Sequence, residues 1–96
     1  MRQLHGIELR HVLTMQLSQN GPATIVGMIE ALGRHGFFVG GRASKAVSDA
    51  LRWEIGRGRV RRLGRGLYAA GFIPHATEYR IINRVLALRE AAKLSL

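Results

Sequence analysis

Apolar residues recur at helical spacing through the first third of the chain. The apolar positions between residues 7 and 17 favour one face of a helix over about 8–18. The sequence Asn20-Gly21-Pro22 is a strong breaker and ends this helix. Thr24 is placed to cap a second helix, whose apolar face runs from Ile25 to Leu32. We therefore predict two helices before Gly36.

The middle of the chain adds a third helix with two distinct faces. The apolar run and glycine pair at 37–41 fit either a turn or a small strand. Ser44 is a candidate N-cap for a helix that continues to about Ile55. Its apolar stripe consists of Val47, Ala50, Leu51 and Ile55. The opposite side carries polar residues at i, i+3, i+4 and i+7: Lys45, Ser48, Asp49 and Arg52.

The periodicity changes after the third helix. Two short runs flank the sequence Gly64-Arg65-Gly66, which predicts a β-hairpin over about 58–71. We expect Val60 and Leu63 to face the core and Tyr68 to pair across the hairpin. The arginines of this segment then lie on its outer face and at its tip.

Pro74 marks the start of a final segment with a long helix over 77–94. Its apolar stripe is wide enough either to cover the core of the same chain or to form a dimer interface. We favour a homodimer, with an interface formed by Tyr79, Ile82, Val85, Leu86 and Arg89. The expected organisation is a domain over 1–73 followed by this C-terminal helix over 74–96.

Charge separates the middle of the chain from its flanks. The 96 residues include 15 Lys and Arg against 6 Asp and Glu, a net charge of +9, and 13 of these bases are arginine. Segment 42–65 holds eight bases and two acids, a net charge of +6. Such a one-signed block is typical of a surface for a polyanion. Nucleic acid is the favoured partner, with an acidic protein or a membrane surface as alternatives.

Three motifs in order carry a family resemblance. They are the helix sequence Ser44–Arg52, the strand start Gly58-Arg59-Val60 and the return strand Gly66-Leu67-Tyr68. Over about residues 7–71 the chain resembles the winged helix-turn-helix family of DNA-binding domains, in its bacterial regulator form. Segment 36–43 is longer and richer in glycine than the turn of that family. The resemblance implies a mainly α fold: a three-helix core, a basic hairpin (the wing) and an added C-terminal helix.

The resemblance also implies how DNA is contacted. The third helix, over about 44–56, would enter the major groove, and the wing over about 58–71 would reach the backbone or the minor groove. Lys45 and Arg52 suit guanine edges, and Asp49 suits cytosine or the orientation of those two cations. The full candidate set for DNA binding is Arg42, Ser44, Lys45, Ser48, Asp49, Arg52, Arg57, Arg59, Arg61, Arg62 and Arg65.

Catalytic and metal chemistry find no support in the sequence. No cysteine is present, which excludes disulfides and thiolate sites. The four histidines are scattered, and the six acids form no pair suited to acid–base work. We expect no enzyme activity, metal or cofactor, and no small-molecule ligand is evident. No apolar run could span a membrane, and the first five residues lack a signal-like stretch, so we expect a cytoplasmic, nucleoid-associated protein without membrane contact.

Taken together, these features predict a double-stranded DNA-binding transcriptional regulator. Two other functions stay open. One is an architectural, nucleoid-associated protein of the same fold, whose binding would follow phosphates and groove shape. The other is a winged-helix module that binds protein or RNA.

Overall fold

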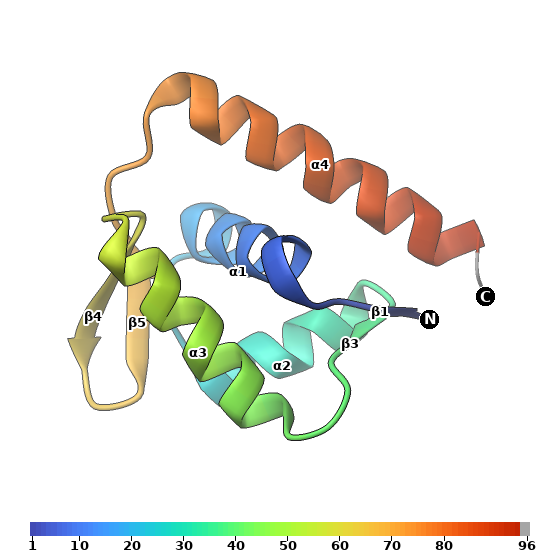
Figure 1. Cartoon of the computed structure of the whole chain (residues 1–96), viewed down its shortest axis with the longest axis horizontal. Coiled ribbons are helices and arrows are strands. Elements are labelled where there is room, and N and C mark those ends of the chain that lie inside the picture. Colours follow the sequence, from blue (N-terminus) through green and yellow to red (C-terminus); the bar gives the residue numbers. More distant parts are fainter. Residues whose placement is uncertain (95–96) are drawn as a thin grey trace.

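The computed structural model describes residues 1–94 and is mixed α/β, with most residues in four helices (Figure 1). The last two residues of the expected C-terminal segment 74–96 lie outside the described residues. In chain order the elements are β1 (Arg2–Gln3), α1 (Gly6–Asn20), β2 (Ala23–Thr24), α2 (Ile25–Arg34), β3 (Phe37–Phe38), α3 (Ala43–Gly56), β4 (Val60–Gly64), β5 (Leu67–Ala70) and α4 (His75–Leu94).

Helix α1 is the centre of the fold. It contacts α2, α3, α4 and β5, with α3 and α4 on opposite sides of it (Figure 1). Every residue from Val12 to Leu17 is buried, so the middle of α1 is covered on all sides, while its last three residues are exposed. A helix buried on every side belongs to the interior of a fold rather than to its surface. The other elements therefore share one core around α1.

Two small sheets join segments that are distant in the sequence. Strand β1 pairs in parallel with β3, and Arg2 lies opposite Phe37. Of the two structures predicted for 37–41, a turn or a small strand, the strand is therefore present at Phe37–Phe38. Phe37 is buried and Phe38 exposed, as alternation along a strand requires. The second sheet is antiparallel, in the order β2-β5-β4, so the residues just before α2 add a third strand to the predicted hairpin.

The helix starts are set by different means. The predicted cap of α2 is confirmed: the Gly27 amide donates to Thr24 Oγ1 at 3.0 Å. The predicted cap of α3 is wrong, because the helix begins at Ala43 with Arg42 in the N-cap position and no side-chain cap. Gly41 adopts a φ of 63°, which turns the chain into the helix earlier than expected. Ser44 consequently lies exposed within the first turn.

The hairpin follows its prediction at Val60 and Tyr68 and departs from it at Leu63. Val60 and Tyr68 are buried, but Leu63 is 47% exposed. Residues three apart in a strand point to opposite faces, so Val60 and Leu63 cannot both face the core. At the base of the hairpin, the Gly71 amide donates to the Arg59 carbonyl at 2.8 Å. A Cβ on Gly71 would collide with the carbonyl oxygen of Gly58, so this close approach requires glycine.

Helix α4 covers α1 with a stripe that includes part of the expected dimer interface. Its buried residues are Ile81, Val85, Leu88 and Ala92. Val85 is fully buried within the chain and Ile82 packs against the same core, so neither offers the free surface expected of a dimer contact. Tyr79 and Leu86 are exposed, and Arg89 is half-buried. Within residues 1–94, no helix has the length and apolar character needed to cross a membrane.

Candidate nucleic-acid interface

The outer face of α3 is polar because its inner face is anchored in the core. Val47, Ala50 and Leu51 are buried, which leaves Lys45, Asp49 and Arg52 exposed on the other side. Lys45 Nζ donates to Asp49 Oδ2 at 2.8 Å, and Arg52 Nη1 lies 3.6 Å from Asp49 Oδ1. The hydrogen bond from Lys45 lowers the pKa of Asp49. The carboxylate therefore stays charged and lies between the two cations.

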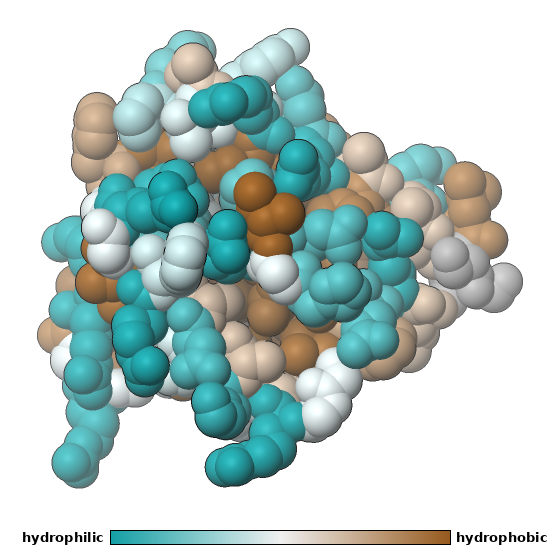
Figure 2. Space-filling model, in the orientation of Figure 1, coloured by the Kyte–Doolittle hydropathy of each residue, from teal (hydrophilic) through white to brown (hydrophobic). Residues whose placement is uncertain are grey.

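Two arginines of the β4–β5 hairpin are tied to the backbone by one nitrogen each. Arg61 Nε donates to the Ala70 carbonyl at 3.0 Å, and Arg62 Nε donates to the Gly64 carbonyl at 3.2 Å. Both side chains remain exposed, as does Arg65 in the turn. The hydrogen bonds orient the side chains and leave the terminal guanidinium nitrogens available for a phosphate. Figure 2 shows the hydrophilic side chains that extend outward from this region of the surface.

Trp53 lies between two arginines. The residue is 50% exposed, with the guanidinium carbon of Arg10 at 4.9 Å and that of Arg57 at 5.1 Å from the ring centre. These distances are those of cation–π contacts. The structure places Trp53 in a stack on the outer surface. Arg10 lies 43 positions away in the sequence, and no local pattern connects it with Trp53.

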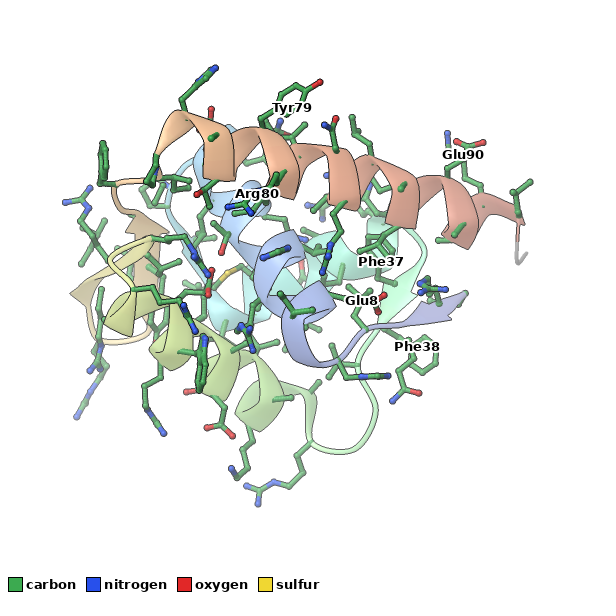
Figure 3. The ribbon with its side chains drawn as sticks, turned by 45° about the horizontal axis from the view of Figure 1, so that its top comes forward. Glu8, Phe37, Phe38, Tyr79, Arg80 and Glu90 are labelled. Atoms are coloured by element: carbon green, nitrogen blue, oxygen red, sulfur yellow. The ribbon has the colours of Figure 1, made fainter. Side chains whose placement is uncertain are left out.

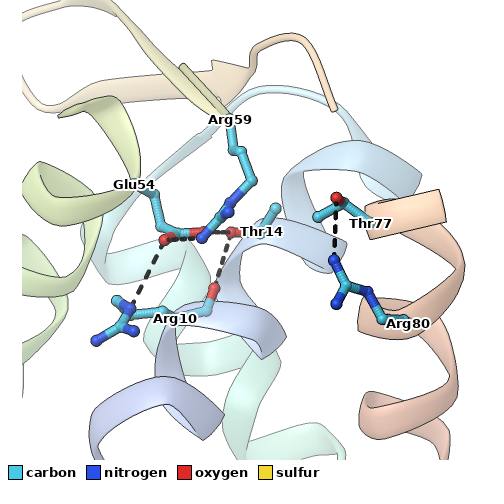
Figure 4. A network of polar contacts seen from close by, with 6 residues as sticks. All are labelled: Arg10, Thr14, Glu54, Arg59, Thr77 and Arg80. Carbon is cyan, nitrogen blue, oxygen red and sulfur yellow. Dashed lines mark hydrogen bonds and ion pairs between the residues drawn. The ribbon is translucent and has the colours of Figure 1, made fainter. Parts of the chain in front are cut away.

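A buried carboxylate joins α1, α3 and the start of β4. Glu54 is fully buried and accepts hydrogen bonds from Thr14 Oγ1 at 2.8 Å and from Arg59 Nε and Nη2 at 2.9 and 2.7 Å (Figure 4). Arg10 Nε lies 3.6 Å from the same carboxylate. Burial alone would raise the pKa of Glu54, but the hydrogen bonds from Arg59 and Thr14 and the charges of Arg59 and Arg10 lower it.

This network corrects the role expected for Arg59. Its side chain is 16% exposed and makes a two-pronged ion pair with Glu54, so it is a structural residue rather than a free phosphate contact. Sequence analysis missed Glu54 as a functional residue. The signal was present: Glu54 lies seven residues after Val47, which places a carboxylate on the buried stripe of α3.

The other candidate residues gather over α3 and the hairpin. Ser44 is exposed at the start of α3, and Ser48 is half-buried on its side. The exposed cations of this surface are Arg42, Lys45, Arg52, Arg57, Arg61, Arg62 and Arg65. Asp49 is the one exposed acid of segment 42–65, since Glu54 is buried against Arg59. We call these seven cations with Asp49 the basic face.

Histidines and acids do not gather elsewhere. In the part of the chain that the structure describes, no group of three or more His, Asp or Glu side chains is placed to hold a metal ion. Burial is the main cause that lowers the pKa of both His11 and His35, and neighbouring arginines lower it further. Both imidazoles are therefore held toward the neutral form.

No protein-family model matches the chain, and no curated protein or solved structure matches it either.

Proposed function

We propose that the chain is a winged helix-turn-helix protein that binds double-stranded DNA and regulates transcription. Three arrangements support the proposal. Helices α1, α2 and α3 share one core, β2 joins the β4–β5 hairpin, and that hairpin follows α3 directly. In this proposal α3 is the recognition helix and the hairpin is the wing.

The basic face is the observation that carries the proposal. It presents seven cations and one carboxylate, six of the cations being arginines suited to bidentate phosphate and guanine contacts. Helix α3 has 14 residues, a length of about 21 Å at 1.5 Å per residue, and is exposed along one side. A helix of this kind fits the major groove, while the hairpin arginines reach the flanking phosphates or the minor groove.

The Lys45–Asp49–Arg52 group favours a regulator over an architectural protein. Asp49 lies 2.8 Å from Lys45 and 3.6 Å from Arg52, which favours particular positions of these donors on α3, and positioned donors discriminate between bases. A surface that follows only phosphates and groove shape has no need of a carboxylate among its cations. The arginines of the hairpin would serve either function.

The test compares two arginines that the proposal places differently. A preferred duplex is first selected from a random library, and binding is measured to it and to a scrambled duplex. Arg52→Ala is expected to cost about 1–3 kcal/mol on the preferred duplex and much less on the scrambled one. Arg65→Ala is expected to weaken both equally and to reduce the salt slope of log affinity by about one. Arg34→Ala is the charge-matched control, because Arg34 is exposed on α2, outside the basic face.

Each result has a defined meaning. Equal losses on both duplexes for Arg52→Ala would contradict base reading by α3 and favour the architectural function. Losses for Arg34→Ala as large as those for Arg52→Ala and Arg65→Ala would contradict the assignment of binding to the basic face. A native affinity independent of salt would contradict the whole proposal.

We also propose that the protein acts as a homodimer through the outer side of α4. Tyr79 and Leu86 are 64% and 50% exposed, and their spacing of seven residues places them on the same side of the helix. Figure 3 shows Tyr79 extending outward from α4. A dimer would present two α3 helices to successive turns of the major groove, about 34 Å apart.

A further inference from the structure

A second cationic feature lies between α1, α4 and the turn that leads from α3 to β4. It is a pocket of about 540 Å³, and its lining includes His11 and five arginines: Arg10, Arg57, Arg59, Arg80 and Arg84. The arginines come from three separate parts of the chain. Only Arg57 belongs to the basic face as well. We call this feature the arginine pocket.

The positive charge of the arginine pocket is only partly balanced. Glu54 lies against Arg59 and Arg10 and neutralises one charge (Figure 4). Among residues 1–94, no carboxylate forms an ion pair with Arg57, Arg80 or Arg84. Arg80 makes one long hydrogen bond, from Nη2 to Thr77 Oγ1 at 3.4 Å. In Figure 3, Arg80 extends from the side of α4 that faces α1; Tyr79 extends outward but also contributes to the lining of the pocket.

His11 shows how the surrounding charges act inside the pocket. Burial lowers the pKa of His11 most, and the charge of Arg84 lowers it further. Nδ1 of His11 is buried and has no hydrogen-bond partner within the described chain. A buried polar atom without a partner is costly, and so is the concentration of like charge around it. An anion in the pocket would relieve the charge repulsion.

We propose that the arginine pocket binds a small, multiply charged phosphorylated anion. Guanidinium groups recognise phosphate oxygens in pairs, and several from different elements converge here. The volume lies within the range of small-molecule sites, about 300–1,000 Å³. A concave pocket of this size can enclose a small anion, whereas a DNA duplex would present only single phosphates to it. This site is additional to the proposed DNA-binding function and does not depend on it.

The pocket has direct structural links to the basic face. Arg57 both lines the pocket and stacks on Trp53, and Trp53 follows Arg52 on α3. Arg59 lines the pocket and immediately precedes β4 of the hairpin. An anion that draws Arg57 toward the pocket changes the surroundings of Trp53, the single tryptophan of the chain. Tryptophan fluorescence is therefore an internal reporter of binding.

The test uses inorganic tripolyphosphate as the probe, with the full chain at constant ionic strength. We expect saturable one-to-one binding by calorimetry and a matching change in Trp53 fluorescence. The double variant Arg80→Ala/Arg84→Ala is expected to weaken binding at least about 10-fold, because charge-assisted hydrogen bonds are lost. Both residues lie outside the Glu54 network, so a thermal melt of this variant should remain cooperative.

The matched control removes two exposed cations elsewhere. Arg34→Ala/Lys93→Ala lies outside both the pocket and the basic face and is expected to change tripolyphosphate affinity less than about 2-fold. Equal weakening by both double variants, or no saturable binding by the native chain, would overturn the proposal. It would also be overturned if duplex DNA displaced the probe and Arg80→Ala/Arg84→Ala abolished DNA binding, because the pocket would then be part of the DNA surface. Failure of DNA binding alone leaves these outcomes unaffected.

Discussion

Replacing Glu54 by glutamine is the most direct test of how the hairpin is held against the helices. The substitution keeps the size of the side chain and removes its charge. Arg59, only 16% exposed, then loses its ionic partner, and Arg10 loses the carboxylate 3.6 Å from its Nε. Uncoupling a buried ion pair in this way costs about 3–5 kcal/mol.

This cost is large compared with the total stability expected. A chain of 96 residues has a free energy of unfolding of about 5–14 kcal/mol at 0.05–0.15 kcal/mol per residue. With a urea dependence of about 1–3 kcal/mol per molar, the unfolding midpoint of Glu54→Gln should fall by on the order of 2 M. Glu30→Gln is the control, because Glu30 is exposed on α2 and forms no ion pair within residues 1–94. Its free energy of unfolding should change by less than about 0.5 kcal/mol.

The effect should depend on pH in a defined direction. The pKa of Glu54 is lowered in the folded protein from its usual value of 4.5, so the ionised carboxylate contributes stability that is present above pH 4.5. That contribution is lost as pH falls through the lowered value. The gap between native protein and Glu54→Gln should therefore narrow below pH 4.5. His35 titrates in both proteins and cancels from the difference. The Glu54 charge raises the pKa of His11, so the His11 contribution cancels only once Glu54 is protonated. A loss below about 1 kcal/mol at neutral pH, or a gap unaffected by acid, would refute the reasoning.

Two further predictions concern α4 and the core. Leu86→Asp should convert the dimer to a monomer in sedimentation, while the circular dichroism spectrum stays helical. Leu86 is 50% exposed, so a charge there mainly opposes an intermolecular contact. A native protein that sediments as a monomer at tens of micromolar would contradict the dimer. Gln16→Met should raise the free energy of unfolding, measured in urea, by about 1–2 kcal/mol. Both polar atoms of the Gln16 side chain are buried without hydrogen-bond partners, and an apolar side chain of similar size removes that cost. An unchanged or lowered urea midpoint would show that the Gln16 amide has hydrogen-bond partners.

Periodicity was a good guide to the helices and a poor one to the short strands. The helix faces and the hairpin followed from spacing, because a stripe of apolar residues has few ways to be buried. Strands β1, β2 and β3 have two residues each and carry no alternation that a sequence can show. Their pairing is set by distant partners, such as Arg2 opposite Phe37. No local rule predicts such contacts.

The candidate site was predictable as a surface but not as a set of contacts. The charge block at 42–65 predicted the basic face, because a cluster of like charges cannot be buried in the core. Whether a given arginine is free depends on tertiary partners, and Arg59 is held by a carboxylate that the sequence counted only as an opposing charge. The arginine pocket draws on Arg10, Arg80 and Arg84, which are separated by up to 74 positions and meet only after folding.

The central position of α1 bears on how the molecule can come apart. Because α1 touches three helices and β5, its amides between Val12 and Leu17 become accessible only when those neighbours have separated. Terminal fraying of α4 or movement of the hairpin tip leaves that stretch covered. Hydrogen exchange there therefore measures the global unfolding equilibrium, whereas exchange in the outer elements reports smaller, local openings. The basic face can therefore move on binding while the amides of α1 stay protected from exchange.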